Sequence, residues 1–563
     1  MDYDQLLYAA NYQPEPGTPG GKVIISDWQA ANQLNYYFSN AFANSEVLAA
    51  TTVGLLDVSA DGHYYPELAA EPITFGKSVT KDPSGDGFTV HVKLKPNLKW
   101  SDGQPLTMDD FKYAHDWVLD KGQTGVSTLG WEEIDKVTVS ADKLEADFHF
   151  PKAYAGWLGT IGSNPPLPEH YIKTFNIKDG NKTYPLNANI AKAPVDGPFK
   201  YVTASPDTIE LARNDNWAAG SHAPYLDSVT FKFFPDNKDG MIAAFKNGEI
   251  DVALDLVQDD YDAIKDVDPS IGKAVLEPAW LYEHLDMNEA GLGQGKGDPA
   301  LQDVNVRKAI YQAIDKKALW NTVFPGAPDP EVTACSNATP TNYWYKSDLQ
   351  CPTFDLAAAN KLLDDNGYTK NADGTRNGKD GKPLTFEHCT SDAGFRKTGG
   401  EFIANALKQI GITLNLNFVD STNVLFANWP DVSADTKCNL AHGNYDTSEF
   451  AYVLSFDLFG DYYYSYASEQ IPTDANKGNG YNYLRLKDAD MDAAIGVLKN
   501  SIDPKDQVQA AYKIQEVYAE KVPEVALYYR NEARGVSVKL HNFLKNPSTA
   551  SDMWNIEDWW VQQ

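Results

Sequence analysis

The segment 383–420 constrains the fold more than any other part of the chain. It reads PLTFEHCTSD at 383–392, GGEFIANALKQIG at 399–411 and ITLNLNFVD at 412–420. The outer stretches have the apolar content and alternation of strands, whereas the middle one repeats apolar residues every three or four positions, as a half-buried helix does. A strand, a helix and a strand in this order place two parallel strands in one layer. We therefore predict the α/β fold class.

Further periodic segments extend this interpretation along the chain. A helix is predicted after Thr107, because Thr107 and Asp110 have the spacing of a capping box. At about 150 residues per domain, the 563 residues indicate two to four domains. Strands are predicted at 22–26, 88–95, 143–150, 226–234 and 524–530, and helices at 304–320 and 503–523.

The charge balance limits what the chain can bind. It has 48 Lys and Arg against 78 Asp and Glu, so its formal net charge is −30. The electrostatic field of this negative charge repels nucleic-acid phosphates and anionic lipid headgroups, and it is compatible with neutral or cationic ligands. No apolar run approaches the ~18–20 residues that a membrane-spanning helix needs. We expect a soluble globular protein that binds neither nucleic acid nor a membrane surface directly.

Motifs of catalysis and metal binding are missing from the sequence. There is no GxSxG, no HExxH and no Walker loop, and the glycine-rich stretch 291–298 lacks the P-loop spacing. The stretch NADGTRNGKDG at 371–381 lacks the glutamate that closes a calcium loop, so we predict two tight turns of a hairpin there. The sequence therefore predicts no cofactor, no metal and no enzymatic activity, with a hydrolase as a remote alternative.

Four cysteines bear on the cellular compartment. Cys335 and Cys351 bracket a loop rich in turn formers, which predicts a loop closed by a disulfide. Cys389 and Cys438 then either pair with each other or remain as buried thiols. Two disulfides would place the protein in an oxidising, extracytoplasmic compartment.

One motif carries a specific resemblance. The stretch LKPNLKWSDGQPLTMDDFKYAHDWV at 94–118 resembles a block of the extracytoplasmic solute-binding proteins of the peptide/nickel class (family 5) of ABC importers. Together the similar blocks cover the chain from about residue 20 to the C-terminus, in the family's order. The other blocks lie at 64–75, 193–217, 245–252, 305–315 and 354–368.

The resemblance implies a bilobal, periplasmic-binding-protein-like fold (type II, cluster C) with three domains. Strands at 281–288 and 525–533 would form a two-strand hinge, so that the lobes close on a ligand like a trap. The implied boundaries are an N-terminal tether at 1–19, domain I at 20–65, 190–285 and 526–563, domain II as an insertion at 66–189, and domain III at 286–525.

The resemblance also implies the function of a binding subunit that captures an oligopeptide and delivers it to a membrane permease. Such proteins are monomers outside the cytoplasm, either in the periplasm or at the outer face of the cell membrane on an N-terminal lipid anchor. We expect that a leader has been removed ahead of this N-terminus. An oligosaccharide is the alternative ligand, because 13 Trp and 31 Tyr suit stacking on sugar faces. Nickel or haem carriage has little support from ten scattered His, and a pure scaffold is a further alternative.

Candidate ligand contacts follow from the rule that ligands of open α/β sheets bind beyond the carboxyl ends of strands. Trp280 precedes a hinge strand, and Trp429 lies beyond strand 412–420. The loops after strands 22–26 and 383–392 add Trp28, Asn32 and Asn35, and Ser391, Asp392, Phe395 and Arg396.

The stretch FDLFGDYYYSY at 456–466 is the last candidate. Peptide-binding members of the family carry an aspartate here that pairs with the α-ammonium group of the ligand. The resemblance assigns this role to Asp457 or Asp461, with Tyr462 beside them and Phe456 and Phe459 in the core. The Pro-Asp-Pro that follows in peptide binders is absent, so the oligosaccharide alternative stays open.

Overall fold

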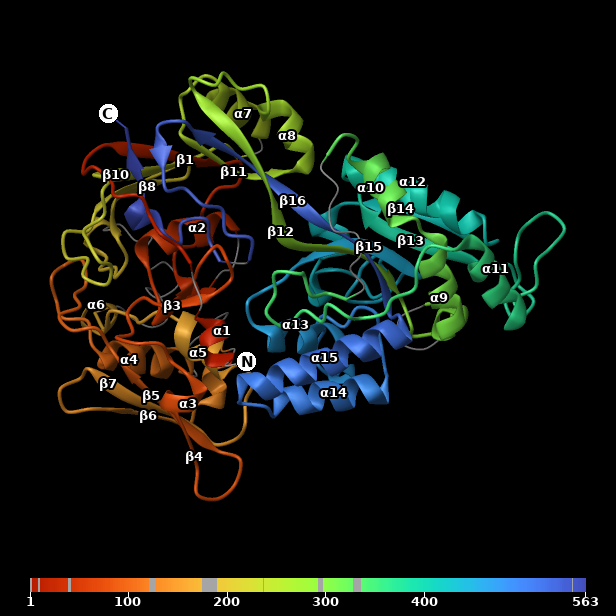
Figure 1. Ribbon diagram of the computed structural model, residues 1–563, viewed down its shortest axis with the longest axis horizontal. Coiled ribbons are helices and arrows are strands. Elements are labelled where there is room, and N and C mark those ends of the chain that lie inside the picture. The colour runs from red at the N-terminus through yellow and green to blue at the C-terminus, as the bar shows by residue number, and fades with distance from the viewer. Residues whose placement is uncertain are drawn as a thin grey trace. The chain divides into compact units, whose positions relative to one another are not determined.

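The computed structural model describes residues 3–8, 11–38, 42–120, 128, 130–174, 190–235, 237–291, 297–327, 336–548 and 550–562. The chain forms two compact units (Figure 1). Unit 1 comprises Met1–Ala279, Asn500–Pro504 and Asn531–Gln563, and unit 2 comprises Trp280–Lys499 and Lys505–Arg530. Two long strands, β12 (Gly272–Met287) and β16 (Glu524–Ser537), run from one unit into the other.

The main sheet of unit 1 is built around β1 (Lys22–Asp27). This strand lies between β10 and β11 and is parallel to both, while the remaining pairs are antiparallel. Its other strands are β8 (Phe199–Ser205), β9 (Thr208–Arg213), β10 (Ser228–Phe233), β11 (Val252–Val257) and the second half of β16. The predicted strands at 22–26 and 226–234 are thus confirmed.

Helices cover both faces of this sheet. Val23 and Ile25 of β1 pack in one apolar core with helix α2 (Phe42–Thr51). Ile24, between them, packs in a second core with α7 (Lys238–Lys246) and α8 (Gln258–Ile264). Buried residues on both faces are what a central strand of an α/β layer requires.

A smaller antiparallel sheet belongs to the same unit. Phe88, Val90 and Val92 alternate into its core. The side chain of Asp110 accepts the N–H of Thr107 (2.9 Å) at the start of α4 (Met108–Val118), as the capping box predicts. The sheet order is β4 (Val79–Lys81), β5 (Phe88–Lys93), β7 (Glu145–Phe150), β6 (Lys136–Val139). Unit 1 also contains α1 (Tyr3–Leu7), β2 (Leu56–Val58), β3 (Tyr64–Pro66), α3 (Phe75–Ser78), α5 (Trp157–Ser163) and α6 (Glu169–Ile172). Strands β17 (Leu540–His541) and β18 (Trp560–Val561) form a separate two-stranded sheet, whose Leu540 and Val561 pack in the core of the main sheet.

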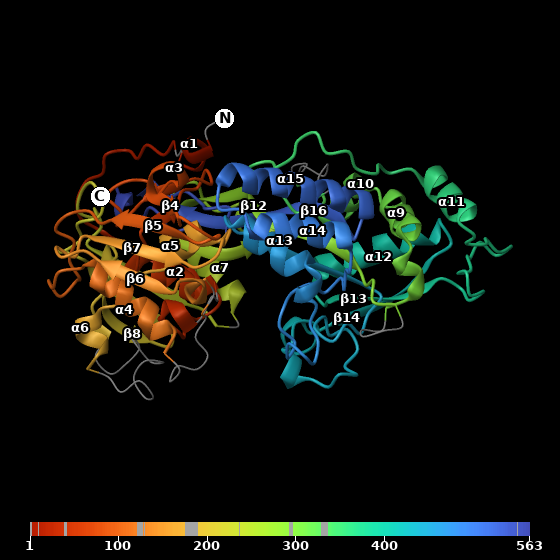
Figure 2. The ribbon, with the colours of Figure 1, turned by 90° about the horizontal axis from the view of Figure 1, so that it is seen from below.

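Unit 2 contains the predicted strand–helix–strand segment. Strands β13 (Thr385–Ser391) and β14 (Thr413–Val419) are parallel and in register, and α12 (Gly394–Lys408) packs on them (Figures 1 and 2). The sheet continues through β15 (Thr447–Val453) to β12 and the first half of β16. Its other helices are α9 (Val304–Ala313), α10 (Lys316–Val323), α11 (Leu356–Asp365), α13 (Leu458–Tyr466), α14 (Ala489–Lys499) and α15 (Pro504–Lys521).

The helix predicted at 304–320 is two helices, because Asp315 caps a new one. Helix α9 ends at Ala313, and the Asp315 side chain accepts the N–H of Ala318 (3.0 Å) at the start of α10. An aspartate at such an N-cap satisfies a backbone donor that the helix itself leaves unpaired. The apolar stripe read from the sequence is correct, but the capping preference of Asp315 interrupts it.

We expect Asp315→Ala to lower the free energy of unfolding by about 1 kcal/mol, since alanine leaves the N–H of Ala318 without its acceptor. Urea titration followed by circular dichroism measures the change. Asp315→Asn is the matched control, because asparagine caps equally well. An equal loss in both variants would contradict the capping role.

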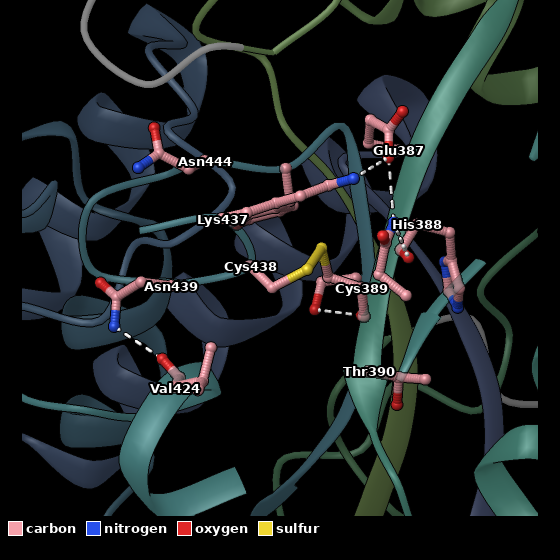
Figure 3. The surroundings of a disulfide bond; sticks show 12 residues. Glu387, His388, Cys389, Thr390, Val424, Lys437, Cys438, Asn439 and Asn444 are labelled. Carbon is pink, nitrogen blue, oxygen red and sulfur yellow. Dashed lines mark hydrogen bonds and ion pairs between the residues drawn. A yellow bond between two sulfur atoms is a disulfide. The ribbon is translucent and has the colours of Figure 1, made fainter. Parts of the chain in front are cut away.

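One predicted disulfide is present (Figure 3). Cys389 on β13 bonds to Cys438 in the loop before β15, and neither cysteine is exposed. Beside it, the Lys437 ammonium group lies 2.7 Å from the Glu387 carboxylate. The alternative of two buried thiols is thereby excluded. Cys335 lies outside the described residues, so its pairing with Cys351 stays a prediction.

Two segments outside the main helices and strands, 371–381 and 11–19, also bear on the predictions. At 371–381 the N–H of Gly374 donates to Asn371 and that of Gly381 to Gly378, so the two predicted tight turns are confirmed. Residues 11–19, which the resemblance assigns to a tether, hydrogen-bond to unit 1 through the N–H groups of Asn11 and Glu15. Among the described residues, no helix combines the length and apolarity that crossing a bilayer requires.

Candidate ligand-binding site

The predicted residues after β13 converge on a buried carboxylate. Arg396, in the first turn of α12, donates from Nε and Nη2 to the two oxygens of Glu283 (2.9 and 3.3 Å) and from Nη1 to Ser391 Oγ (3.0 Å). Glu283 on β12 has no exposed surface. Burial alone would raise the pKa of Glu283, but Arg396 and Arg530 hold this pKa below its ordinary value. The main contact of Arg396 within the chain is thus its ion pair with Glu283.

Phe395 lies beside the two arginines, whereas Asp392 does not join the cluster. The Phe395 ring centre is 5.1 Å from the Arg396 guanidinium and 4.9 Å from that of Arg530. Asp392 is exposed, and its backbone N–H donates to Val419 on β14. Three of the four predicted residues of this loop therefore lie together.

Glu449 was missed by the sequence reasoning. It lies on β15 without exposed surface, and neither carboxylate oxygen has a hydrogen-bond partner among the described residues. Burial, followed by the charge of Glu283, raises the pKa of Glu449 well above its ordinary value, which favours the protonated form of this carboxyl group. A single glutamate in an apolar strand gives no sequence signal that its carboxyl group will be buried without a hydrogen-bond partner.

The two candidate aspartates lie at the start of α13. Asp457 is the N-cap residue and accepts the N–H of Phe459 (3.1 Å), while Asp461 accepts the N–H and hydroxyl groups of Ser455 (3.0–3.2 Å). Among the described residues, no basic side chain forms an ion pair with either. Burial raises the pKa of Asp457 to about 6 and that of Asp461 well above its ordinary value. Both carboxyl groups suit a cationic partner from outside the chain.

Aromatic rings gather next to these aspartates. Trp280, which is only 2% exposed, stacks on Phe456 (ring centres 6.3 Å apart) and donates from Nε1 to Thr341 Oγ1 (2.8 Å). Tyr343 packs against Phe456 at 5.4 Å. Tyr462 of α13 is also buried, at 1% exposure. Trp280 and Tyr462 thus lie inside the packing of unit 2.

The remaining predicted residue of unit 2, Trp429, lies in a different environment. Its ring contacts His442, with centres 4.0 Å apart, and its side chain fills the space beside Gly478. Gly478 has φ +78°, and a Cβ there would lie 2.2 Å from Trp429. This tryptophan is therefore held by a loop that requires glycine.

The three predicted residues of unit 1 follow β1. Trp28 donates from Nε1 to the Asp255 carbonyl (3.0 Å), and the Lys238 ammonium group lies 4.8 Å from its ring. Asn35 is buried and accepts the N–H of Tyr37 (3.1 Å), whereas Asn32 is exposed. Asn35 thus has a turn-forming role, and Trp28 packs against its own unit.

The most informative feature of unit 2 is an open strand edge. Leu454 donates its N–H to Trp280 of β12, so the backbone N–H and C=O of the preceding Val453 point away from β12. On that outer side, the register of β13 with β15 ends at Thr390–Glu449. The Val453 side chain is 52% exposed. An extended chain can add to such an edge through its own backbone groups.

Comparison with known proteins decides the family. Residues 63–472, more than half of the chain, match the bacterial extracellular solute-binding proteins, family 5. The chain belongs to this family. This match confirms the resemblance to the family. The structural similarities that follow confirm the predicted type II periplasmic-binding-protein fold class.

Several oligopeptide-binding proteins are similar over most of their length. The oligopeptide-binding protein AppA of Bacillus subtilis (strain 168) is 27% identical over 482 residues, covering 84% of this chain and 81% of AppA. The structure of AppA with a nonapeptide has a TM-score of 0.70 at 24% identity, covering 98% of this chain and 100% of that one. An oligopeptide-binding protein of Thermus thermophilus with a pentapeptide has a TM-score of 0.71 at 23% identity, covering 96% of each chain.

A relative whose name gives another specificity is also similar. The periplasmic alpha-galactoside-binding protein of Rhizobium meliloti (strain 1021) is 25% identical over 410 residues, covering 66% of this chain and 57% of the relative. Similarity to these relatives alone therefore does not choose between a peptide and a sugar.

Proposed function

We propose that this protein is the solute-binding subunit of an ABC importer and that its solute is an oligopeptide. The family supports the binding role, and the oligopeptide-binding relative AppA supports the ligand. The observation that carries the peptide assignment is the open edge of β15 at Val453. A peptide backbone offers a donor and an acceptor at strand spacing, which a sugar does not.

The aspartates at the start of α13 complete this proposal. Asp457 follows Val453 by four residues, on the same connection from β15 to α13. A peptide that pairs with the edge at Val453 would bring its α-ammonium group toward Asp457. A charge-assisted hydrogen bond of this kind contributes about 1.5–3 kcal/mol.

We further propose that the protein releases its peptide unchanged to a membrane permease. It would act as a monomer outside the cytoplasm, held by an N-terminal lipid anchor, with β12 and β16 as the hinge and unit 1 divided into the two domains implied by the sequence. The extracellular location is supported by the family. Turnover of a bound peptide that a single acid-to-amide substitution abolishes would contradict the binding-only role.

Native mass spectrometry of the purified protein tests the ligand class. We expect mass additions that, after release under denaturing conditions, fragment as peptides. Hexose ladders in the released material would instead assign the protein to the sugar binders, in line with the galactoside-binding relative. Treating the sample with a broad-specificity peptidase after release distinguishes the two classes independently.

Val453→Pro tests the strand edge itself. Proline removes the N–H of Val453, so peptide affinity is expected to fall about tenfold, which is the loss of one backbone hydrogen bond. Proline is tolerated at an edge whose N–H points outward, so the unfolding temperature should change little. Val453→Ala is the matched control, since it keeps the N–H. Equal affinity of the two variants, measured by calorimetry, would show that the peptide does not use this edge.

A further inference from the structure

A cavity of about 310 Å³ lies within unit 1. Its wall combines residues from distant parts of the chain: the N-terminal segment at Tyr12, the end of β3 at Tyr65, and the C-terminal stretch around Trp554. All of them belong to unit 1, whereas the strand edge at Val453 belongs to unit 2. The cavity is therefore separate from the proposed peptide contacts.

Three aromatic rings line the cavity. Tyr12 and Tyr65 pack against Trp554, with ring centres 4.8 and 6.0 Å from it. The Tyr65 hydroxyl donates to the Trp554 carbonyl (2.8 Å), and Asn555 Nδ2 donates to the Tyr12 hydroxyl (2.7 Å). These bonds fix the rings, so the aromatic part of the lining is a built surface.

Carboxyl groups also line the cavity. Glu67 is 5% exposed, and its Oε1 has no hydrogen-bond partner among the described residues. Glu557 and Asp558 line the same cavity, and the Asp558 carboxylate is held by His222 Nε2 at 2.9 Å. Burial of a carboxyl group without a partner is unfavourable, so the unpaired oxygen of Glu67 indicates a place for a donor that the chain does not supply.

Lys95 lines the cavity but does not supply that donor. Its ammonium group donates to the carbonyls of Ala219 (2.7 Å) and Pro66 (3.2 Å). Within the described part of the chain, it forms no ion pair with Glu67. The cavity lining thus holds three carboxyl groups against one lysine.

We propose that this cavity binds a small organic cation that carries an alkylammonium group. The ammonium group would donate to the Glu67 carboxyl group, with the carboxyl groups of Glu557 and Asp558 in the same lining. The alkyl part would lie against Trp554 and the two tyrosines, whose ring faces attract cations. The volume fits several non-hydrogen atoms with room beyond a single metal ion. The site is independent of the proposed peptide function.

Calorimetric titration of the full chain with putrescine tests the proposal, with 1,4-butanediol as the neutral molecule of matched shape. We expect saturable millimolar or tighter binding of putrescine and none of the diol. Glu67→Gln should weaken putrescine at least about tenfold. Asp315→Asn, in unit 2 and outside both proposed sites, should leave it unchanged. Wild-type protein without saturable putrescine binding, or equal binding of the diol, would overturn the proposal.

Two further measurements distinguish loss of the cavity site from unfolding and from putrescine binding in unit 2. If Glu67→Gln is unfolded by circular dichroism, Glu557→Gln takes its place with the same expected loss. If putrescine binding is lost in Asp457→Asn but kept in the cavity variants, the cation occupies unit 2 and the proposed site in unit 1 is wrong.

Discussion

Replacing Asp457 by asparagine is expected to weaken peptides with a free α-ammonium group by about 30- to 150-fold. Asparagine keeps the shape and the cap of α13 but removes the negative charge, so the ligand's cation is left without its partner at a partly buried site. Such a loss corresponds to about 2–3 kcal/mol. Calorimetric titration of both proteins with one peptide measures it.

The same substitution should stabilise the ligand-free protein. The folded-state pKa of Asp457 is raised from 3.8 to about 6, so the folded state binds more protons between these values and its stability falls as the pH rises through this range. Asparagine does not titrate. We therefore expect Asp457→Asn to gain about 1–2 kcal/mol over the wild type at about pH 8, and little or nothing below about pH 4. Urea unfolding at the two pH values measures the difference.

Two controls separate an ammonium contact from a general effect. An N-acetylated peptide should bind both proteins equally, because it lacks the cation. Asp461→Asn should have the smaller effect on charged peptides, since both oxygens of Asp461 already accept from Ser455. Equal weakening of free and acetylated peptides by Asp457→Asn would contradict the role assigned to this residue.

The second large effect is expected at Arg396. Replacing it by methionine leaves Glu283 buried, with Arg530 Nη1 at 3.7 Å as its remaining cationic partner. Breaking a buried ion pair in this way destabilises a protein by about 3–5 kcal/mol. We expect a loss near the lower end, about 3 kcal/mol, because Arg530 stays. Thermal and urea unfolding of the ligand-free protein measure it.

Asp392→Asn serves as the matched control for this loop, because Asp392 is exposed and should change stability by less than about 0.5 kcal/mol. Adding Glu283→Gln to Arg396→Met should recover part of the loss, since no buried charge then remains unpaired. An Arg396→Met variant of native stability that fails to bind peptide would show that Arg396 contacts the ligand directly.

Much of the fold follows from local periodicity. The segment 383–420 shows its strand–helix–strand pattern within 38 residues because each element buries one face against its neighbour in the chain. The capping box at Thr107 and the turns at 371–381 are equally local, since their hydrogen bonds join residues two to four positions apart.

The candidate site was less accessible to sequence reasoning because its contacts are distant in the chain. Arg396 and Glu283 are separated by 113 positions, and no local pattern indicates that they pair. The stretch 456–466 is a helix from Leu458 onward, although its aromatic content does not favour one. The Asp457 cap sets its start, and packing of Tyr462 and Phe459 into the core supplies its stability.

Calorimetric titration of the full chain with oligopeptides of free N-terminus, and in parallel with alpha-galactosides, tests the central claim most directly. The proposal of an oligopeptide-binding subunit predicts saturable one-to-one binding of peptides, weakened in Val453→Pro and in Asp457→Asn, and no saturable binding of the sugars. Saturable binding of the galactosides alone, unaffected by either substitution, would contradict it.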